Sequence, residues 1–193
     1  MHNIYSCVDS FTSLLNVQYL FILGRKNTSV SLRICFDKKD CFHLMGLQYL
    51  TDKPELSRDR GKIFDEIKNR KITITQIESS YFYSKISSRI QMLPYLEELF
   101  DSNDTIFKYH QKSNSFSLIQ ADYLMKNSFQ NTNIYIFLSK TSNKTYFCRS
   151  FFPETNRNYD RNLPSWTLLY KEKTNIFTGN SIILFNKLNP NNM

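Results

Sequence analysis

The sequence has little glycine, with only four glycines among its 193 residues. It contains no Gly-rich phosphate loop, no Gly-x-Ser-x-Gly elbow and no His-Glu-x-x-His pair. Such motifs mark phosphate-binding loops, serine hydrolases and zinc hydrolases. Their absence sets aside nucleotide hydrolysis and zinc hydrolysis as functions of this chain.

Cysteine and long apolar runs are also scarce. The four cysteines Cys7, Cys35, Cys41 and Cys148 are scattered without a Cys-x-x-Cys pair, which predicts buried free thiols rather than a disulfide framework or a zinc site. No stretch approaches the about twenty consecutive apolar residues of a membrane helix. The N-terminus lacks a basic region followed by an apolar signal core. We therefore expect a cytoplasmic protein with no membrane partner, no metal and no cofactor.

The residues that are abundant are apolar, aromatic and basic. Apolar residues make up 41% and aromatic residues 15% of the chain, which is enough for the core of a single domain spanning residues 1–193. The formal net charge is +8. This excess favours a polyanionic partner such as RNA or DNA, although a merely solvated basic surface remains an equal alternative.

The hydrophobic period changes along the chain. Helical spacing predicts helices at 3–18, 41–50, 57–70 and 82–100, the last bent or divided by Pro94. Alternation and turn residues predict strands at 19–25, 29–36, 105–109, 117–124, 133–139, 144–152, 165–171 and 181–185. This order predicts an α+β fold, with helices mostly in the N-terminal half packed on an antiparallel β-sheet built largely from the C-terminal half. We expect a mobile loop at 154–162 and a disordered tail at 187–193.

His43 is the first candidate for chemistry, because it lies in a nearly all-apolar stretch, 41–50. The other histidines are at the N-terminus and in a polar stretch, so His43 is the imidazole that its surroundings hold in place. It is either a core histidine bonded to a backbone carbonyl or an acid–base group. Gly46, one helical turn later, would leave room for a substrate against the imidazole.

Arg89 is the second candidate, because helical spacing places it inside an apolar stripe of the 82–100 helix. It either extends to solvent or pairs with a buried carboxylate, or it opens into a cleft and meets a phosphate.

The third candidate is the strand 146–153. Alternation places Arg149 on one face with Phe147 and Phe151, and Ser150 on the other face, so one of the two polar residues stands among aromatic neighbours. Ser150 either bonds nearby backbone or, beside Arg149, holds a scissile phosphate. On the next strand, Tyr170 and Lys171 are weaker candidates of the same type.

Three short runs together resemble a known family. They are Ile34-Cys35-Phe36, Phe42-His43-Leu44-Met45-Gly46 and Tyr146-Phe147-Cys148-Arg149-Ser150-Phe151-Phe152-Pro153. They resemble the phage-associated barnase/EndoU/colicin/RelE-like nuclease domains, nearest to the fourth of these groups, over about residues 19–172. The resemblance implies a compact α+β fold and a metal-independent ribonuclease of a phage, mobile element or toxin system. His43 and Ser150 match the family's pattern, whereas Arg89 and Arg149 follow only from their own settings.

This activity would cleave RNA by transesterification, with tRNA or another structured RNA as the target. A base takes the proton of the 2′-hydroxyl, the oxygen attacks the adjacent phosphorus, and an acid protonates the departing 5′-oxygen. We expect His43 as acid or base, Arg89 and Ser150 as further catalytic residues, and Arg149, Tyr170 and Lys171 as substrate-binding residues. No second group stands out that titrates near neutral pH, which leaves a tyrosine or a carboxylate such as Glu78.

Partners of such a protein would include an antitoxin, an immunity protein or a host defence protein. The alternative function is a non-enzymatic phage or mobile-element protein that binds and inhibits a host defence complex or nucleic acid. The same basic, aromatic composition serves that function equally well.

Overall fold

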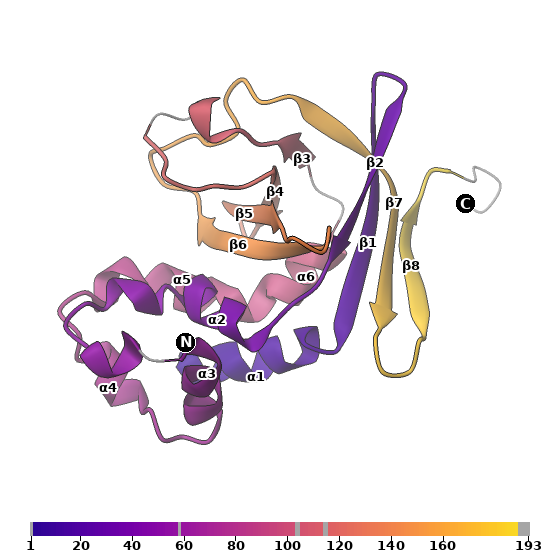
Figure 1. Ribbon diagram of the computed structural model, residues 1–193. Coiled ribbons are helices and arrows are strands. Elements are labelled where there is room, and N and C mark those ends of the chain that lie inside the picture. Colours follow the sequence, from indigo (N-terminus) through magenta and orange to yellow (C-terminus); the bar gives the residue numbers. More distant parts are fainter. Residues whose placement is uncertain (1, 58, 103–104, 114–115, 189–193) are drawn as a thin grey trace.

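The computed structural model describes residues 2–57, 59–102, 105–113 and 116–188 (Figure 1). In this part of the chain all α-helices precede the third strand. They are α1 (Ile4–Leu14), α2 (Lys38–Met45), α3 (Arg60–Lys68), α4 (Ile74–Glu78), α5 (Ser87–Met92) and α6 (Leu96–Asp101). Short 3-10 turns are η1 (Leu47–Tyr49), η2 (Pro54–Ser57), η3 (Tyr83–Lys85), η4 (Leu93–Tyr95) and η5 (Gln111–Ser113). The predicted 82–100 helix is therefore divided, and Pro94 lies in η4 between α5 and α6.

The strands form one sheet in the order β1-β2-β6-β5-β4-β3-β7-β8. Their bounds are β1 (Val17–Arg25), β2 (Thr28–Ile34), β3 (Thr105–Lys108), β4 (Tyr123–Phe129), β5 (Thr132–Lys140), β6 (Tyr146–Pro153), β7 (Ser165–Asn175) and β8 (Ser181–Asn186). Strand β7 also pairs with β1, so seven strands close into a β-barrel and β8 is added to β7. All neighbours are antiparallel except β2 and β6, which are parallel.

This architecture contradicts the predicted fold class, which was helices packed on an antiparallel sheet from the C-terminal half. The sheet is closed, and β1 and β2 from the N-terminal quarter complete it. Closure is possible because β7 is 11 residues long. It pairs along β1 from Val17–Asn175 to Gly24–Thr167, and at its start with β3 through Ile106–Trp166. Alternation within a strand reveals neither of these long-range pairings.

Several local predictions are confirmed and one strand is wrong. Helices α1 and α3 lie within the predicted 3–18 and 57–70, and the hairpin of β1 and β2 occurs where it was expected. The predicted helix at 41–50 is confirmed only in part, because α2 begins at Lys38 and ends at Met45. The predicted strand at 117–124 is wrong over 117–122, because β4 begins only at Tyr123. Of the predicted tail at 187–193, residues 189–193 lie outside the described residues. None of the described helices is long and apolar enough to cross a membrane.

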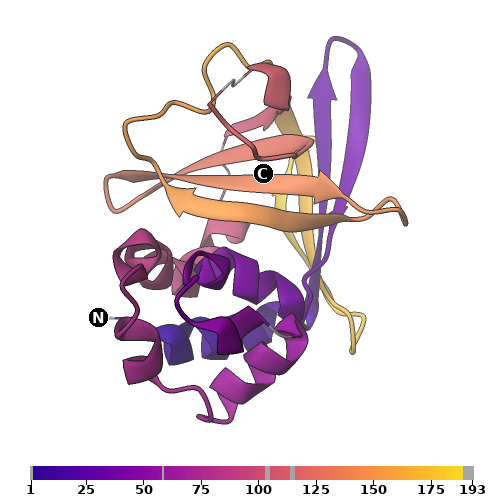
Figure 2. The same cartoon turned by 60° about the vertical axis from the view of Figure 1, so that its left-hand side comes forward.

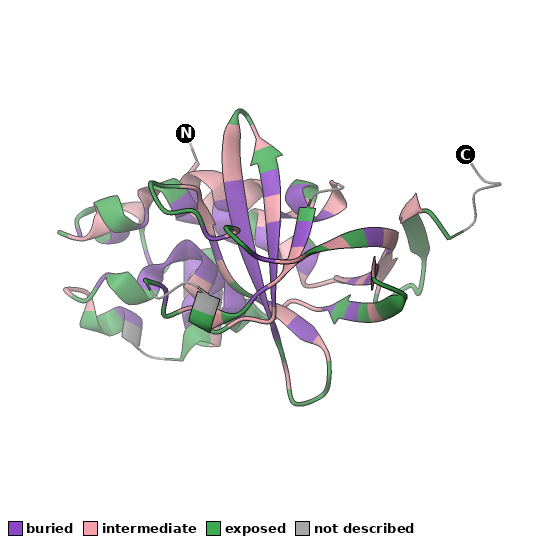
Figure 3. Ribbon diagram, turned by 90° about the horizontal axis from the view of Figure 1, so that it is seen from above, coloured by how far each residue is buried: buried purple, intermediate pink, exposed green. Residues whose placement is uncertain are grey.

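Two hydrophobic clusters form the core. The larger joins the helices to the barrel, and the smaller contains Tyr109, Phe137 and Tyr159. Figure 3 shows the buried residues along the central strands and the adjoining helices. The four cysteines are free thiols as predicted, three buried and Cys35 partly exposed. Tyr159 shows that part of the predicted 154–162 loop is packed in the core, whereas its mobility stays a prediction.

The helices gather on one side of β6 (Figure 2). Helices α2 and α5 both lie against this strand. Helix α2 begins with a capping box: the Asp37 side chain accepts a hydrogen bond from the backbone N–H of Asp40, and the Asp40 side chain accepts one from the backbone N–H of Asp37. The helix ends at Gly46. Four of the candidate residues, His43, Arg89, Arg149 and Ser150, lie on these three elements.

Candidate active site

Strand β6 contains a β-bulge at Arg149. On the neighbouring β5, Phe137 pairs with Ser150 and Leu138 pairs with Cys148, so Arg149 has no partner in the ladder. The bulge interrupts the alternation of the strand, and Cys148 and Phe151 both enter the larger core. The predicted division of this strand into two faces is therefore wrong beyond Cys148. Arg149 and Ser150 both remain outside the core, instead of one of them facing it.

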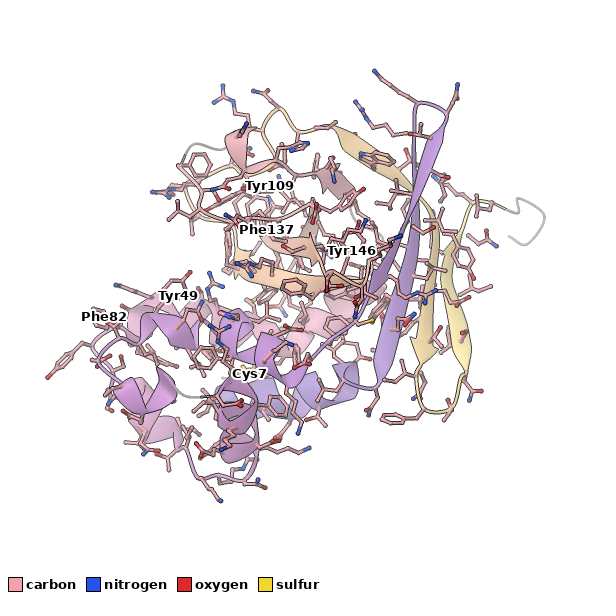
Figure 4. All side chains as sticks on the ribbon, in the orientation of Figure 1. Cys7, Tyr49, Phe82, Tyr109, Phe137 and Tyr146 are labelled. Atoms are coloured by element: carbon pink, nitrogen blue, oxygen red, sulfur yellow. The ribbon has the colours of Figure 1, made fainter. Side chains whose placement is uncertain are left out.

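His43, Arg149 and Ser150 line one cavity of about 260 Å³, which we call the His43 cavity. His43 comes from the last turn of α2, whereas Arg149 and Ser150 come from the bulge of β6. Its wall is completed by Tyr49 of η1 and by residues 118–120, which precede β4. Figure 4 shows Tyr49 where the helices approach the sheet. Segments far apart in the sequence thus form one site.

The imidazole of His43 is half-buried and in a positive environment. Burial lowers its pKa below the usual histidine value, and the charges of Arg60 and Arg149 lower it further. A hydrogen bond with Gln48 opposes these effects in part. His43 is consequently neutral at neutral pH, which suits a group that accepts a proton. Among the described residues it makes no hydrogen bond to a backbone carbonyl, which was the structural alternative for this side chain.

Asp40 is a titratable group of the same cavity that the sequence analysis missed. It lies one helical turn before His43, and its side chain is 5% exposed. Its Oδ2 accepts a hydrogen bond of 2.9 Å from the backbone N–H of Asp37. Burial is the main cause that raises the pKa of Asp40 to about 6. The Asp-x-x-His spacing in the sequence was a signal for the pair of Asp40 and His43. Glu78, the carboxylate that the sequence suggested as a partner of His43, lies instead on α4 beside Tyr83.

Arg89 lies beside the His43 cavity. Its side chain is 8% exposed, and its guanidinium Nη1 donates a hydrogen bond of 2.7 Å to the carbonyl oxygen of Phe151. The guanidinium carbon lies 5.5 Å from the ring centre of Tyr49 and 5.1 Å from that of Phe152. No carboxylate of the described residues forms an ion pair with it, so neither structural alternative for Arg89, exposure or a buried ion pair, applies.

A second cavity of about 460 Å³ contains Arg89, and we call it the Arg89 cavity. It adjoins the His43 cavity, because Tyr49, Ser150 and residues 118–119 line both. Lys85 and Arg157 are its other basic residues. The structure thus places His43, Arg149 and Ser150 together and puts Arg89 next to them, with Ser150 between the two cavities.

Comparison with known proteins identifies the family. The family model described as phage-Barnase-EndoU-ColicinE5/D-RelE like nuclease 4 matches residues 3–188 of the chain. The chain belongs to this family. The resemblance inferred from short motifs is thereby confirmed, and it covers more of the chain than they indicated. Neither the search of curated proteins nor the search of solved structures found a match.

Two predicted substrate-binding residues of this phage-associated nuclease lie elsewhere. On β7, the Tyr170 hydroxyl donates a hydrogen bond of 2.5 Å to Glu172 Oε2. Lys171 is 1% exposed, and its amine donates to the backbone carbonyls of Phe100, at 2.9 Å, and of Ser102. Neither residue lines the His43 or the Arg89 cavity. Lys171 lies between Phe21 of β1 and Phe185 of β8 in the closed sheet, a setting that alternation alone does not predict.

Gly46 has a different role from the predicted one. Its φ of +82° ends α2 in the left-handed region, and a Cβ there would lie 2.9 Å from Ile86 Cγ2 and 3.0 Å from Arg89 Cδ. The space beside Gly46 is therefore occupied by Ile86 and by Arg89 of α5, and it does not receive a substrate. Within the described part of the nuclease, no three His, Cys, Asp or Glu side chains cluster as a metal site would require.

Proposed function

We propose that this nuclease is an endoribonuclease that cleaves RNA in the His43 cavity without a metal ion, by attack of a 2′-hydroxyl on the adjacent phosphorus. The observation that carries the proposal is the bulge of β6, which leaves Arg149 and Ser150 on the same cavity as His43. Bulges commonly redirect side chains beside active sites. Membership of the nuclease family supports the same conclusion.

The neutral His43 acts as the base. It takes the proton of the 2′-hydroxyl as the oxygen forms a bond to phosphorus and the bond from phosphorus to the 5′-oxygen breaks. The protonated fraction of Asp40 gives a proton to the departing 5′-oxygen. The products are a 2′,3′-cyclic phosphate and a 5′-hydroxyl. Both residues belong to one face of α2, and the raised pKa of Asp40, about 6, keeps part of this carboxyl protonated near neutral pH.

Arg149 and Ser150 act on the phosphate. The guanidinium donates hydrogen bonds to the non-bridging oxygens, on which negative charge builds in the transition state, and the Ser150 hydroxyl is a further donor. The bulge favours this role because Arg149 is exposed at the cavity and is not tied into the regular pairing of β5 and β6, so its guanidinium can reach a substrate there.

The test is incubation of the purified protein with RNA in EDTA, followed by analysis of the product ends. We expect 2′,3′-cyclic phosphate and 5′-hydroxyl ends, and a rate about 10²–10⁴-fold lower for His43→Ala. His110→Ala is the matched control, because His110 is exposed and lines neither cavity. Intact RNA, or equal cleavage by His43→Ala, would refute the proposal. Tight stoichiometric binding of a protein or RNA that ignores His43 would instead support the non-enzymatic alternative.

A further inference from the structure

Arg89 is a buried cation whose charge the described part of the protein does not neutralise. Its one hydrogen bond there goes to the backbone oxygen of Phe151, and no described acceptor contacts the other N–H groups of the guanidinium. Burial lowers the pKa of this group, because the charged guanidinium loses hydration where it lies. A buried charge is normally paired, because its loss of hydration is otherwise uncompensated. An anion that enters from the cavity would supply the pairing.

The guanidinium is also held in a fixed position. The rings of Tyr49 and Phe152 contact it, and Gly46 lies close to Arg89 Cδ. A planar guanidinium in a fixed position suits the two oxygens of a phosphate, because both hydrogen bonds form without further ordering of the side chain.

The Arg89 cavity has the charge of an anion site. Lys85, Arg89 and Arg157 line it, and none of its described lining residues is an Asp or a Glu. Its volume of about 460 Å³ is within the usual size of a small-ligand site.

The cavity also has exposed aromatic surface at its rim. Tyr49 is 43% exposed and Phe116 is 42% exposed. Arg157 lies over the ring of Phe116, with 5.5 Å between the guanidinium carbon and the ring centre. Exposed aromatic rings stack against unpaired nucleic-acid bases, and each stacked base adds affinity whichever of the bases it is.

We infer that the Arg89 cavity binds the phosphate next to the scissile phosphate, while a base of the same strand stacks on Tyr49 or Phe116. The inference rests on the proposed function and extends it to the substrate. Because Ser150 and Tyr49 line both cavities, one RNA strand can occupy them together. The preferred substrate is therefore an unpaired RNA segment with at least two consecutive phosphates.

The experiment compares three substrates: a dinucleotide with only the scissile phosphate, the same dinucleotide with an added 5′-phosphate, and the same with an added 3′-phosphate. We expect kcat/KM to rise about tenfold or more for one of the two longer forms, the gain of charge-assisted hydrogen bonds. Equal kcat/KM for all three substrates would overturn the inference and leave the proposed function intact.

Variants assign the effect to the cavity. Arg157→Ala and Lys85→Ala should lower the ratio of kcat/KM between the favoured phosphorylated dinucleotide and the plain one. Arg89→Lys keeps the charge without the planar fork, and it should lower the same ratio while leaving an amine to bond Phe151. Arg33→Ala is the matched control, because it removes an exposed arginine of β2 that lines neither cavity. An equal fall in the ratio for the control would overturn the assignment.

A binding measurement separates this inference from the proposed function. If no RNA is cleaved, fluorescence anisotropy with labelled deoxy-dinucleotides, which cannot undergo 2′-hydroxyl attack, still compares one phosphate with two. The two-phosphate ligand should bind more tightly than the one-phosphate ligand, and this gain should be lost in Arg157→Ala and kept in Arg33→Ala. That result would support the second phosphate site even if the protein cleaves no RNA. Equal affinity for both ligands would refute it.

Discussion

Replacement of Gly46 by alanine should destabilise the protein through two separate effects. The backbone φ of +82° is unfavourable for any L-residue, by about 1–2 kcal/mol. The new Cβ would also lie 2.9 Å from Ile86 Cγ2 and 3.0 Å from Arg89 Cδ, and overpacking of this kind costs about 1–3 kcal/mol. Ile86 is fully buried and Arg89 is held by Phe151, so neither atom belongs to a freely moving side-chain end. The sum predicts a loss of about 2–5 kcal/mol.

Gly179→Ala is the matched control for this variant. Gly179, between β7 and β8, also has a positive φ, +72°, but a Cβ there would meet no atom within 4 Å. Only the backbone term applies, so the expected loss is about 1–2 kcal/mol. Thermal and urea unfolding measure both variants, and each kcal/mol should shift the Tm by about 2–4 °C in a domain of this size.

The difference between the two variants isolates the packing around Arg89. Gly46→Ala should be about 1–3 kcal/mol less stable than Gly179→Ala. It should also lower the preference for substrates with a second phosphate, because the new methyl group displaces Arg89. Equal losses of stability in the two variants would refute the conclusion that Ile86 and Arg89 fill the space beside Gly46.

Four further predictions concern charge. Asp40 has its pKa raised from 3.8 to about 6, so the folded state holds this proton more tightly than the unfolded state. The stabilisation from this proton is fully present below pH 3.8 and is lost as the pH rises through about 6, so the free energy of unfolding should fall by about 3 kcal/mol over this range. Urea unfolding at a series of pH values measures this fall, and Asp40→Asn should abolish it. Because the pKa of His43 is lowered from 6.5, the acid limb of the pH–rate profile should have its midpoint below 6.5, and a midpoint at or above 6.5 would contradict this environment. Loss of the Asp40 proton should produce the alkaline limb of the same profile, near pH 6. Arg149→Ala should change the free energy of unfolding by less than about 0.5 kcal/mol but lower the rate of RNA cleavage by about 10²–10³-fold. Lys171→Met should instead lower the free energy of unfolding by about 1–3 kcal/mol and leave the cleavage rate unchanged. RNA affinity should fall steeply as salt rises, because bound phosphates release counterions, and an affinity independent of salt would favour a protein partner.

The features that the sequence predicted are those set by nearby residues. Period and turn residues located α3, the hairpin of β1 and β2, and the division of a helix at Pro94. The apolar stretch around His43 was enough to identify it as a candidate, without knowledge of the residues that lie near it in space. Each of these predictions depends on side chains within a few positions of one another, and packing elsewhere did not override them.

The features that it missed depend on contacts between distant segments. Whether β7 would pair with β1 is decided by strands about 150 residues apart, and closure of the barrel follows from that pairing. The bulge at Arg149 depends on the register of β5 against β6, which the sequence of β6 alone does not contain. A strict period of two therefore assigned Phe151 to the wrong face.

Asp40 illustrates why part of the candidate site escaped a local interpretation. Its position, three residues after Asp37, is that of an ordinary helix start, and the carboxylate does take part in the capping box. A cap on an exposed helix would leave this carboxyl in water, with nothing to raise its pKa. Here α2 lies against β6, so the same residue is buried and lines the cavity of His43. The local sequence determines that Asp40 lies in the first turn of a helix, but only the contact of that helix with a strand from the other half of the chain buries the carboxyl in the cavity of His43.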